Sequence, residues 1–195
     1  MPKGAETKQA ILHQGVETAF RVGLGRLTIG ELARGTGLSK SGLFAHFRSK
    51  QALQLEVLGQ ARAEFTDAVI RPAIAMPRGE PRVRELFDRW ADRGLRRSPG
   101  CCLFVKAITE FEGQAGPVHD QLIQDHRDLY DSIAQIFRTG ITEGHFRDDA
   151  DPIQFAFALD GVMFAGYHWL PVYGAEQTVT RSRRAFEALL DAVRS

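Results

Sequence analysis

Apolar residues recur every three or four positions along almost the whole chain, which is the spacing of one face of an α-helix. No stretch alternates between apolar and polar residues as a half-buried strand would. The pattern therefore predicts an all-α protein of about nine helices. The longer apolar stripes place six of these helices at about 50–70, 83–97, 102–111, 118–144, 151–170 and 177–194. Pro72 is expected to break the chain after the first of these six, and Asp151, followed by a proline, is a suitable N-cap for the fifth.

Two shorter stripes near the N-terminus are separated only by a tight turn. Thr28, with a glutamate three residues later, forms a capping box at the start of the first stripe. Ser39 is a suitable N-cap for the second, in which Leu43 and Phe47 share one face. The spacing predicts a helix-turn-helix over about 28–47.

The second of these helices has the size and chemistry to bind DNA. A helix is about 10–12 Å across with its side chains, and the major groove of B-DNA is about 12 Å wide. The N-terminus of a helix favours a phosphate, and Lys40, Arg48 and Lys50 add positive charge nearby. An ordinary helical hairpin with solvated basic residues remains an alternative at this point.

Charge is distributed unevenly along the chain. Residues 1–50 carry eight Lys/Arg against three Glu, a net charge of +5, whereas residues 51–195 carry seventeen Lys/Arg against twenty-one Asp/Glu, a net charge of −4. The overall net charge of +1 hides this asymmetry. The basic N-terminal segment is the part expected to attract phosphate.

A series of motifs at fixed spacing runs through the first quarter of the chain, comprising Thr7, Ile11, Ala19-Phe20, Gly23, Thr28 to Ala33, Gly37 to Lys40, Phe44, Phe47, Lys50 and Leu53. On these positions, residues 7–53 resemble the DNA-binding domain of the tetracycline-repressor-like (TetR) family of bacterial transcriptional regulators. Two departures stand out. The chain has Ser41-Gly42 where the family often has Gly-Thr, and Phe44 where a tyrosine usually reaches a phosphate.

The resemblance implies a domain organisation and a function. A three-helix DNA-binding domain would cover residues 1–49, and a helical ligand-binding and dimerisation domain would cover residues 50–195. Such a protein would bind a palindromic operator in double-stranded DNA as a homodimer and act as a repressor released by a small-molecule effector. The DNA-binding residues that the match implies are Thr28, Ser39, Lys40, Ser41, Gly42, Phe44, His46 and Lys50. Ser39, Lys40, Ser41 and His46 would contact base edges, while Thr28, Phe44 and Lys50 would hold the DNA backbone.

The two C-terminal stripes have more apolar surface than one chain needs. The helix at 151–170 has no wholly polar face, so it must be covered on most sides. A membrane span is the rival explanation, but Gln154, Asp160 and His168 interrupt the apolar run. We therefore expect a homodimer joined as a four-helix bundle through about 151–194, with no membrane partner.

Aromatic side chains in the larger domain offer a lining for an apolar or aromatic effector. The candidates are Phe87, Trp90, Phe104, Phe111, His126, Tyr130, Phe137, Phe164 and His168. Aromatic residues at helical spacing are also typical of an ordinary hydrophobic core. Each of these residues could therefore line an effector site or simply pack in the core.

Catalytic signatures are not found in the sequence. There is no Gly-rich phosphate loop after a strand, no His-Glu-x-x-His and no Cys-x-x-Cys, so we expect no enzyme activity, cofactor or metal. The nearest approach to a metal site is the group His119, Asp125, His126 and Asp128. Because its two histidines are two helical turns apart, a solvated helix face is expected there instead.

Two further expectations concern the cell and an alternative function. The adjacent Cys101 and Cys102 cannot form a disulfide framework, and the N-terminus lacks the apolar core of a signal peptide, which together favour a cytoplasmic protein. A helical protein-interaction adaptor with a degenerate DNA-binding domain is the alternative function. Phe44 and Ser41-Gly42 are the features that favour it.

Overall fold

The structure is a computed structural model that describes residues 3–36, 39, 42–43, 46–95 and 102–195. Within these residues the chain is almost entirely helical, and its β-structure is one isolated bridge between Phe146 and Arg194. The prediction of an all-α protein is confirmed. The chain folds into two compact units, unit 1 (Met1–Glu64 and Cys102–Asp125) and unit 2 (Phe65–Cys101 and His126–Ser195).

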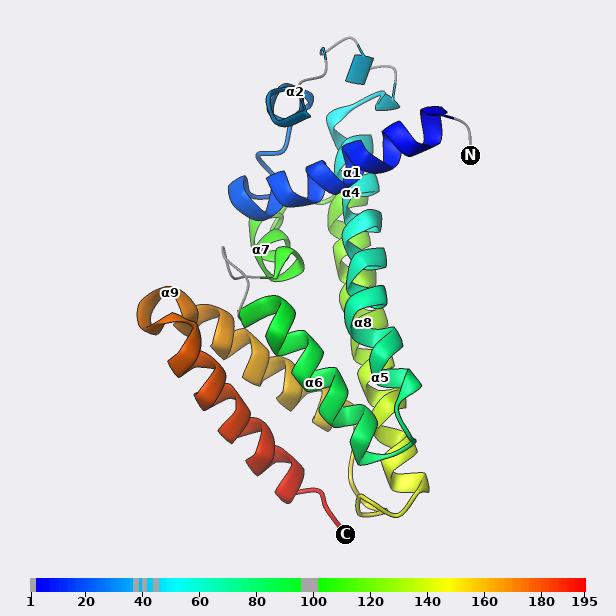
Figure 1. Cartoon of the computed structure of the whole chain (residues 1–195), viewed down its shortest axis with the longest axis vertical. Helices are drawn as coiled ribbons and strands as arrows, with labels where there is room; N and C mark the ends of the chain where they lie inside the picture. The colour runs from blue at the N-terminus through cyan, green and yellow to red at the C-terminus, as the bar shows by residue number, and fades with distance from the viewer. Residues whose placement is uncertain (1–2, 37–38, 40–41, 44–45, 96–101) are drawn as a thin grey trace. The chain divides into compact units, whose positions relative to one another are not determined.

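Unit 1 is built from α1 (Lys3–Val22), α2 (Ile29–Thr36), most of α4 (Lys50–Phe65), α7 (Leu103–Glu110) and the first part of α8 (Pro117–Thr142) (Figure 1). These helices share one hydrophobic core to which each contributes. Its members are Ile11, Leu12, Val16, Ala19, Leu24, Leu27, Ile29, Leu32, Leu43, Phe47, Leu53, Val57, Leu58, Ala61, Leu103, Ala107, Phe111, Val118 and Leu122. Burial of this apolar surface is what holds the short α2 in place, because a helix of two turns is not stable alone.

Unit 2 contains η1 (Thr66–Ile70), α5 (Arg71–Ala75), α6 (Glu80–Leu95), the rest of α8 and α9 (Pro152–Asp191). Its core is rich in stacked phenylalanines. The ring centroids of Phe87 and Phe186 are 4.1 Å apart, and the Phe137 ring lies 4.5 Å from that of Phe146 and 4.2 Å from that of Phe155. These stacks join α6 to α9 and α8 to α9.

The helix that begins at Lys50 runs further than the sequence suggested. It was expected to end near Ile70, with Pro72 breaking the chain, but it continues through η1 and α5 to Ala75. η1 is a π-helical segment, and Pro72 lies in the first turn of α5. A proline is tolerated there because its missing N–H would have no partner within the new helical segment.

The last two predicted helices form a single kinked element. α9 begins at Asp151, whose Oδ1 accepts hydrogen bonds from the Ile153 and Gln154 amides, as the N-cap prediction requires. The helix continues past Pro171 and kinks at Gly174, where φ is +75°. Figure 1 shows α9 turning back on itself. The helix count of the described residues differs slightly from the predicted nine.

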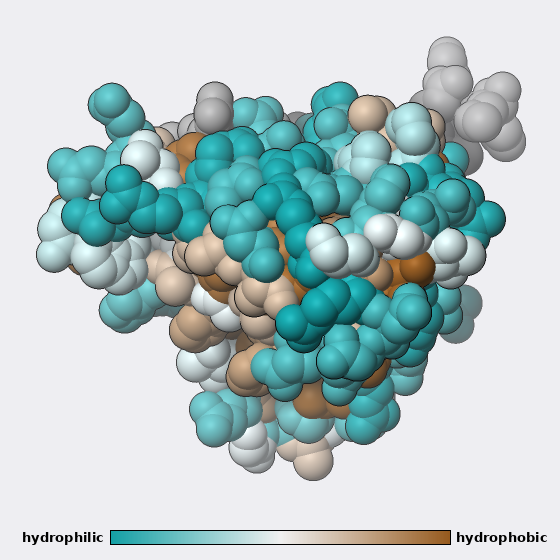
Figure 2. Space-filling view, turned by 90° about the horizontal axis from the view of Figure 1, so that it is seen from below, coloured by the Kyte–Doolittle hydropathy of each residue, from teal (hydrophilic) through white to brown (hydrophobic). Residues whose placement is uncertain are grey.

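Most of the face shown in Figure 2 is hydrophilic, with hydrophobic residues visible in small groups. The large exposed apolar side chains of the described residues lie mainly on α9 and include Ile153, Phe157, Phe164, Trp169, Val172 and Tyr173. None of the described helices combines the length and the apolar character that crossing a membrane would require.

Candidate functional site

The helix-turn-helix begins at Thr28, which caps α2. The Thr28 hydroxyl accepts a hydrogen bond from the Glu31 amide at 3.1 Å, so the predicted N-cap is confirmed. Ile29 and Leu32 then turn into the core of unit 1. The cap and the two apolar anchors fix where α2 starts and which face it buries.

The second helix of the motif is described at Ser39, Gly42, Leu43 and from His46 onward. The Ser39 hydroxyl accepts from the Gly42 amide at 3.1 Å, as an N-cap does. Leu43 and Phe47 are completely buried, which confirms the predicted inward face. Ser39 and Gly42 are exposed and His46 is half-buried. The predicted contact residues Lys40, Ser41 and Phe44 lie outside the described residues.

Lys50 makes a contact within the protein that the sequence did not indicate. It is the first residue of α4, and its Nζ donates to the Gly25 carbonyl at 2.6 Å. The Lys50 ammonium carries three protons. One of them holds the α1–α2 loop.

The α1–α2 loop receives further side chains that sequence reasoning missed. The buried Gln54 donates to the Leu24 carbonyl at 2.8 Å. From α7, the Glu110 carboxylate accepts from the Gly25 amide at 2.7 Å, and Lys106 donates to the Phe20 carbonyl at 3.3 Å. The sequence signal for these contacts is weak, because each is made by a single polar side chain whose partner lies 30 or more positions away in the sequence.

The structure separates the aromatic residues that were predicted to line an effector site. Phe104 and Phe111 belong to the core of unit 1, whereas the others lie in unit 2. Phe87 and Phe137 are members of the phenylalanine stacks, while Phe164 is 54% exposed and His168 is also exposed on α9. The remaining three are Trp90, His126 and Tyr130.

Trp90 is buried against Phe65, with ring centroids 5.8 Å apart and the rings edge to face. Its indole Nε1–H is buried and has no hydrogen-bond partner among the described residues. A buried donor without a partner costs free energy, so an acceptor that reached it would be favoured.

His126 and Tyr130 lie one helical turn apart on α8, close to a carboxylate of α9. The Tyr130 hydroxyl donates to Asp160 Oδ2 at 3.1 Å. Burial raises the pKa of Asp160, while the Tyr130 hydrogen bond and the charge of His126 act in the opposite direction. Burial, followed by the Asp160 charge, raises the pKa of Tyr130 to about 12. Asp160 was noted in the sequence only as a polar interruption of an apolar helix.

In the group that was expected to form a solvated helix face, Asp128 is exposed, and His119 and His126 are half-buried. Asp125 departs from the expectation. Asp125 is buried, with its Oδ1 bound by Arg62 and by Gln121 Nε2, the latter at 2.9 Å. Residues on α4 therefore cover this part of α8. Among the described residues, no group of three or more metal-ligating side chains could hold an ion.

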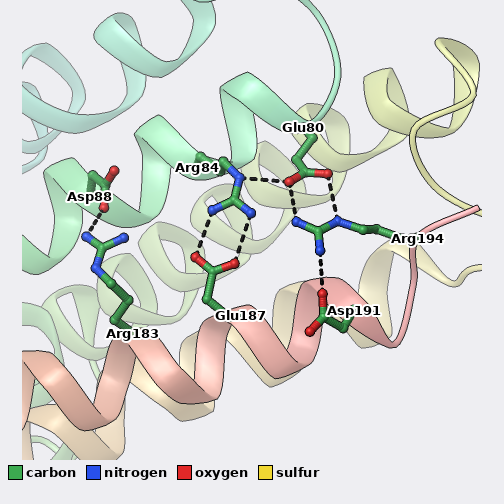
Figure 3. A network of polar contacts seen from close by, with 7 residues as sticks. All are labelled: Glu80, Arg84, Asp88, Arg183, Glu187, Asp191 and Arg194. Atoms are coloured by element: carbon green, nitrogen blue, oxygen red, sulfur yellow. Dashed lines mark hydrogen bonds and ion pairs between the residues drawn. The ribbon is translucent and has the colours of Figure 1, made fainter.

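A network of charged side chains joins α6 to the C-terminal arm of α9, which is the part of α9 after the kink at Gly174 (Figure 3). Arg84 donates two hydrogen bonds to Glu187, at 2.8 and 2.9 Å, and a third to Glu80 at 2.7 Å. Arg194 also binds Glu80, at 2.6 and 3.0 Å. The hydrogen bonds from the two arginines lower the pKa of Glu80 to about 2, against the opposing effect of burial. An additional pair joins Asp88 to Arg183.

Comparison with protein families identifies both parts of the chain. Residues 11–57 match the family described as bacterial regulatory proteins, tetR family, and residues 79–186 match the tetracyclin repressor-like C-terminal domain. No curated protein matches the sequence.

Solved structures of similar fold cover nearly the whole chain. A TetR transcriptional regulator from Chloroflexus aurantiacus is 21% identical in sequence, with a TM-score of 0.84. The match covers 100% of the present chain and 99% of the Chloroflexus chain. A TetR-family regulator from Streptomyces coelicolor is 19% identical with a TM-score of 0.83, covering 98% and 97%. A putative transcriptional regulator from Saccharomonospora viridis, solved with choline, is 21% identical with a TM-score of 0.75, covering 98% and 99%.

Proposed function

Because the chain belongs to the tetracycline-repressor-like (TetR) family of transcriptional regulators, we propose that it is a repressor that binds an inverted-repeat operator as a homodimer. A small apolar or aromatic molecule bound by the C-terminal domain would release it. Regulators of this family are DNA-binding transcription factors and not enzymes, so the enzyme alternative is set aside. Repression is the simpler mode of control because occupying an operator requires no further contact surface.

The observation that carries the DNA-binding proposal is the orientation of the second helix of the motif. Leu43 and Phe47 of this helix are completely buried, whereas Ser39 and Gly42 at its N-terminal end are exposed. Small residues at the start of a helix let its backbone approach DNA closely, and its N-terminus favours a phosphate. Lys40, Ser41 and Phe44 are proposed contacts on the basis of the sequence alone.

Exposed apolar residues on α9 support the proposed homodimer. Ile153, Phe157 and Phe164 are 50%, 72% and 54% exposed, and their spacing puts them on one face of the helix. Burying such side chains stabilises an interface by about 1.5–3 kcal/mol each. A twofold-symmetric pair of recognition helices would read half-sites about 34–36 Å apart, or a multiple of that distance.

Light scattering tests the dimer with a matched pair of variants. Phe157→Glu puts a charge on the proposed interface and should yield a 21.7 kDa monomer at micromolar concentration. Ile74→Glu makes the same change at an exposed apolar residue of α5 and should leave the dimer intact. A wild-type protein that is already monomeric would contradict the proposal.

Polar groups in unit 2 support an effector site between its helices. Tyr130 and Asp160 form a half-buried hydrogen-bonded pair beside His126, and the buried Trp90 offers an N–H donor that has no partner among the described residues. An apolar molecule with one hydrogen-bonding group fits this chemistry. Quenching of tryptophan fluorescence by candidate molecules, compared between the wild type and Asp160→Asn, would locate the site.

Selection of double-stranded DNA from a random pool tests the function itself. An inverted repeat of two short half-sites is the expected result. Ser41→Ala should then alter the preference at a base position by about 1–3 kcal/mol. Recovery of unrelated DNA, with no sequence-specific affinity at any salt concentration, would favour the protein-interaction adaptor instead.

A further inference from the structure

α7 belongs to one part of the chain by sequence and to another by packing. It lies inside the C-terminal family match at residues 79–186, but it packs in unit 1 with the helix-turn-helix. Its Leu103 and Ala107 are completely buried in the core that contains residues of α1, α2 and α4. α7 therefore connects the larger family domain physically to the proposed DNA-binding helices.

The last residue of α7 holds the loop that leads into the helix-turn-helix. Glu110 Oε2 accepts the Gly25 amide proton at 2.7 Å, while Lys50 of α4 donates to the carbonyl of the same residue at 2.6 Å. Gly25 is thus bound on both sides by side chains of two different helices. Gly25 stands three residues before the α2 N-cap Thr28, so the two bonds that hold Gly25 restrict the path by which the chain enters α2.

The glycine at position 23 shows how closely the Glu110 carboxylate approaches the loop. A Cβ atom at Gly23 would lie 2.0 Å from Glu110 Oε1, well inside contact distance. Gly23 also has a φ of +92°, a conformation that favours glycine. The carboxylate therefore lies directly against the loop backbone and cannot be displaced without removing its hydrogen bond to Gly25.

We propose that Glu110 is a positioning residue for DNA binding: its carboxylate holds the α1–α2 loop in the arrangement that presents the recognition helix. DNA affinity then depends on where α7 lies, although Glu110 itself contacts no DNA. This inference rests on the proposed DNA-binding function.

Three variants separate positioning from a general effect of charge. Glu110→Ala removes the acceptor and one negative charge, Glu110→Gln removes the charge but keeps an oxygen that accepts the Gly25 N–H, and Glu112→Ala removes a negative charge from an exposed residue nearby. Loss of negative charge alone should slightly favour DNA binding in all three. Positioning predicts that only Glu110→Ala binds more weakly.

The Kd for the selected operator is measured at several salt concentrations, together with thermal unfolding of each variant. We expect Glu110→Ala to raise the Kd about tenfold with an unchanged salt slope, because a charged hydrogen bond is lost but no phosphate contact is. Glu110→Gln and Glu112→Ala should stay within about threefold of the wild type. Hydrogen exchange of the Gly25 amide should be faster in Glu110→Ala than in Glu110→Gln.

Two results would overturn the inference while the proposed function stands. In the first, the wild type binds the operator and Glu110→Ala binds as tightly as Glu112→Ala. In the second, Glu110→Ala and Glu110→Gln lose affinity equally and unfold at equally lowered temperatures, which would indicate general destabilisation. A wild type that selects no DNA would instead contradict the proposed function.

Discussion

The two units of this protein are fastened by different kinds of polar contact. In unit 1 the α1–α2 loop is held by Gln54, Lys50 and Glu110, which all bond to backbone groups. In unit 2 the C-terminal arm of α9 is held by Arg84 and Arg194, which bond to carboxylates. A bond to the backbone fixes the path of the chain, whereas a half-exposed ion pair mainly holds two formed helices together and weakens in salt.

This difference matches what each unit is proposed to do. A helix that reads bases must be placed accurately, and backbone anchoring of the loop before it provides that accuracy. The arm of α9 is already a formed helix, so side-chain pairs along it suffice. Four measurements, taken from the largest expected effect to the smallest, would test whether the two kinds of contact behave as differently as the structure indicates.

The largest effect is expected at Gly23. Gly23→Ala should lower the free energy of unfolding by about 2–4 kcal/mol, because it combines backbone strain with a clash against Glu110. Gly113→Ala is the matched control, since its φ is also positive, at +73°, but its added Cβ would meet nothing within 4 Å. It should cost only about 1 kcal/mol. Urea unfolding measures both free energies. Equal losses in Gly23→Ala and Gly113→Ala would show that the clash with Glu110 adds nothing to the cost of the Gly23 substitution.

A smaller loss is expected at the buried amide of Gln54. Gln54→Ala leaves the Leu24 carbonyl without its partner and should cost about 1–3 kcal/mol of unfolding free energy. Gln60→Ala removes an amide that bonds only to side chains, Gln9 and Glu64, and should change stability by less than about 0.5 kcal/mol. The unfolding free energy lost in Gln54→Ala should be the same in low and high salt. A loss that becomes smaller in high salt would show that this bond behaves like an ion pair.

The unit 2 network should give a still smaller and salt-sensitive loss. Arg84→Met keeps much of the apolar stem but removes the hydrogen bonds to Glu80 and Glu187, and should cost about 1 kcal/mol at low salt. The loss of stability should decline in 1 M NaCl, because these pairs are partly exposed to solvent and salt screens them. Calorimetry at the two salt concentrations measures the stability lost in Arg84→Met. A loss as large and as independent of salt as that of Gln54→Ala would show that the two units are not held by different kinds of contact.

The smallest effect concerns acid. The pKa of Glu80 is lowered from 4.5 to about 2 by Arg194 and Arg84, so its folded form holds the proton less tightly than the unfolded form. The stability it contributes is present above about pH 4.5 and is lost as the pH falls toward 2. The stability difference between the wild type and Glu80→Gln should therefore be constant from pH 7 to 5 and shrink below that. Thermal unfolding across this range checks it, and a difference that grows in acid would be the contrary result.

Local signals in the sequence predicted much of the fold. Thr28, Ser39 and Asp151 are the N-caps that their hydroxyl and carboxyl groups suggested, and Leu43 and Phe47 are buried as their spacing required. The errors also have local causes. The prediction that Pro72 ends the helix is wrong, because the sequence does not show that a π-helical segment precedes this proline and lets the helix continue.

The candidate sites were predictable only in part. The spacing of Leu43 and Phe47 predicted the buried face of the second helix, and Ser39 and Gly42 are exposed at the N-terminal end of that helix. The proposed effector contacts mix core residues such as Phe137 with half-buried ones such as Tyr130, because both kinds have the same spacing in sequence. Asp160 could not be paired with Tyr130 in advance, since the two residues are 30 positions apart on different helices.

The sequence by itself determined the helices, their caps and their buried faces, because these depend on residues within about one turn of each other. Only the tertiary structure decided which distant side chains meet. Glu110 reaches Gly25 across 85 positions, and Arg194 reaches Glu80 across 114. Such contacts depend on how whole helices pack, and packing is governed by shape and apolar burial over the entire unit, which no local pattern encodes.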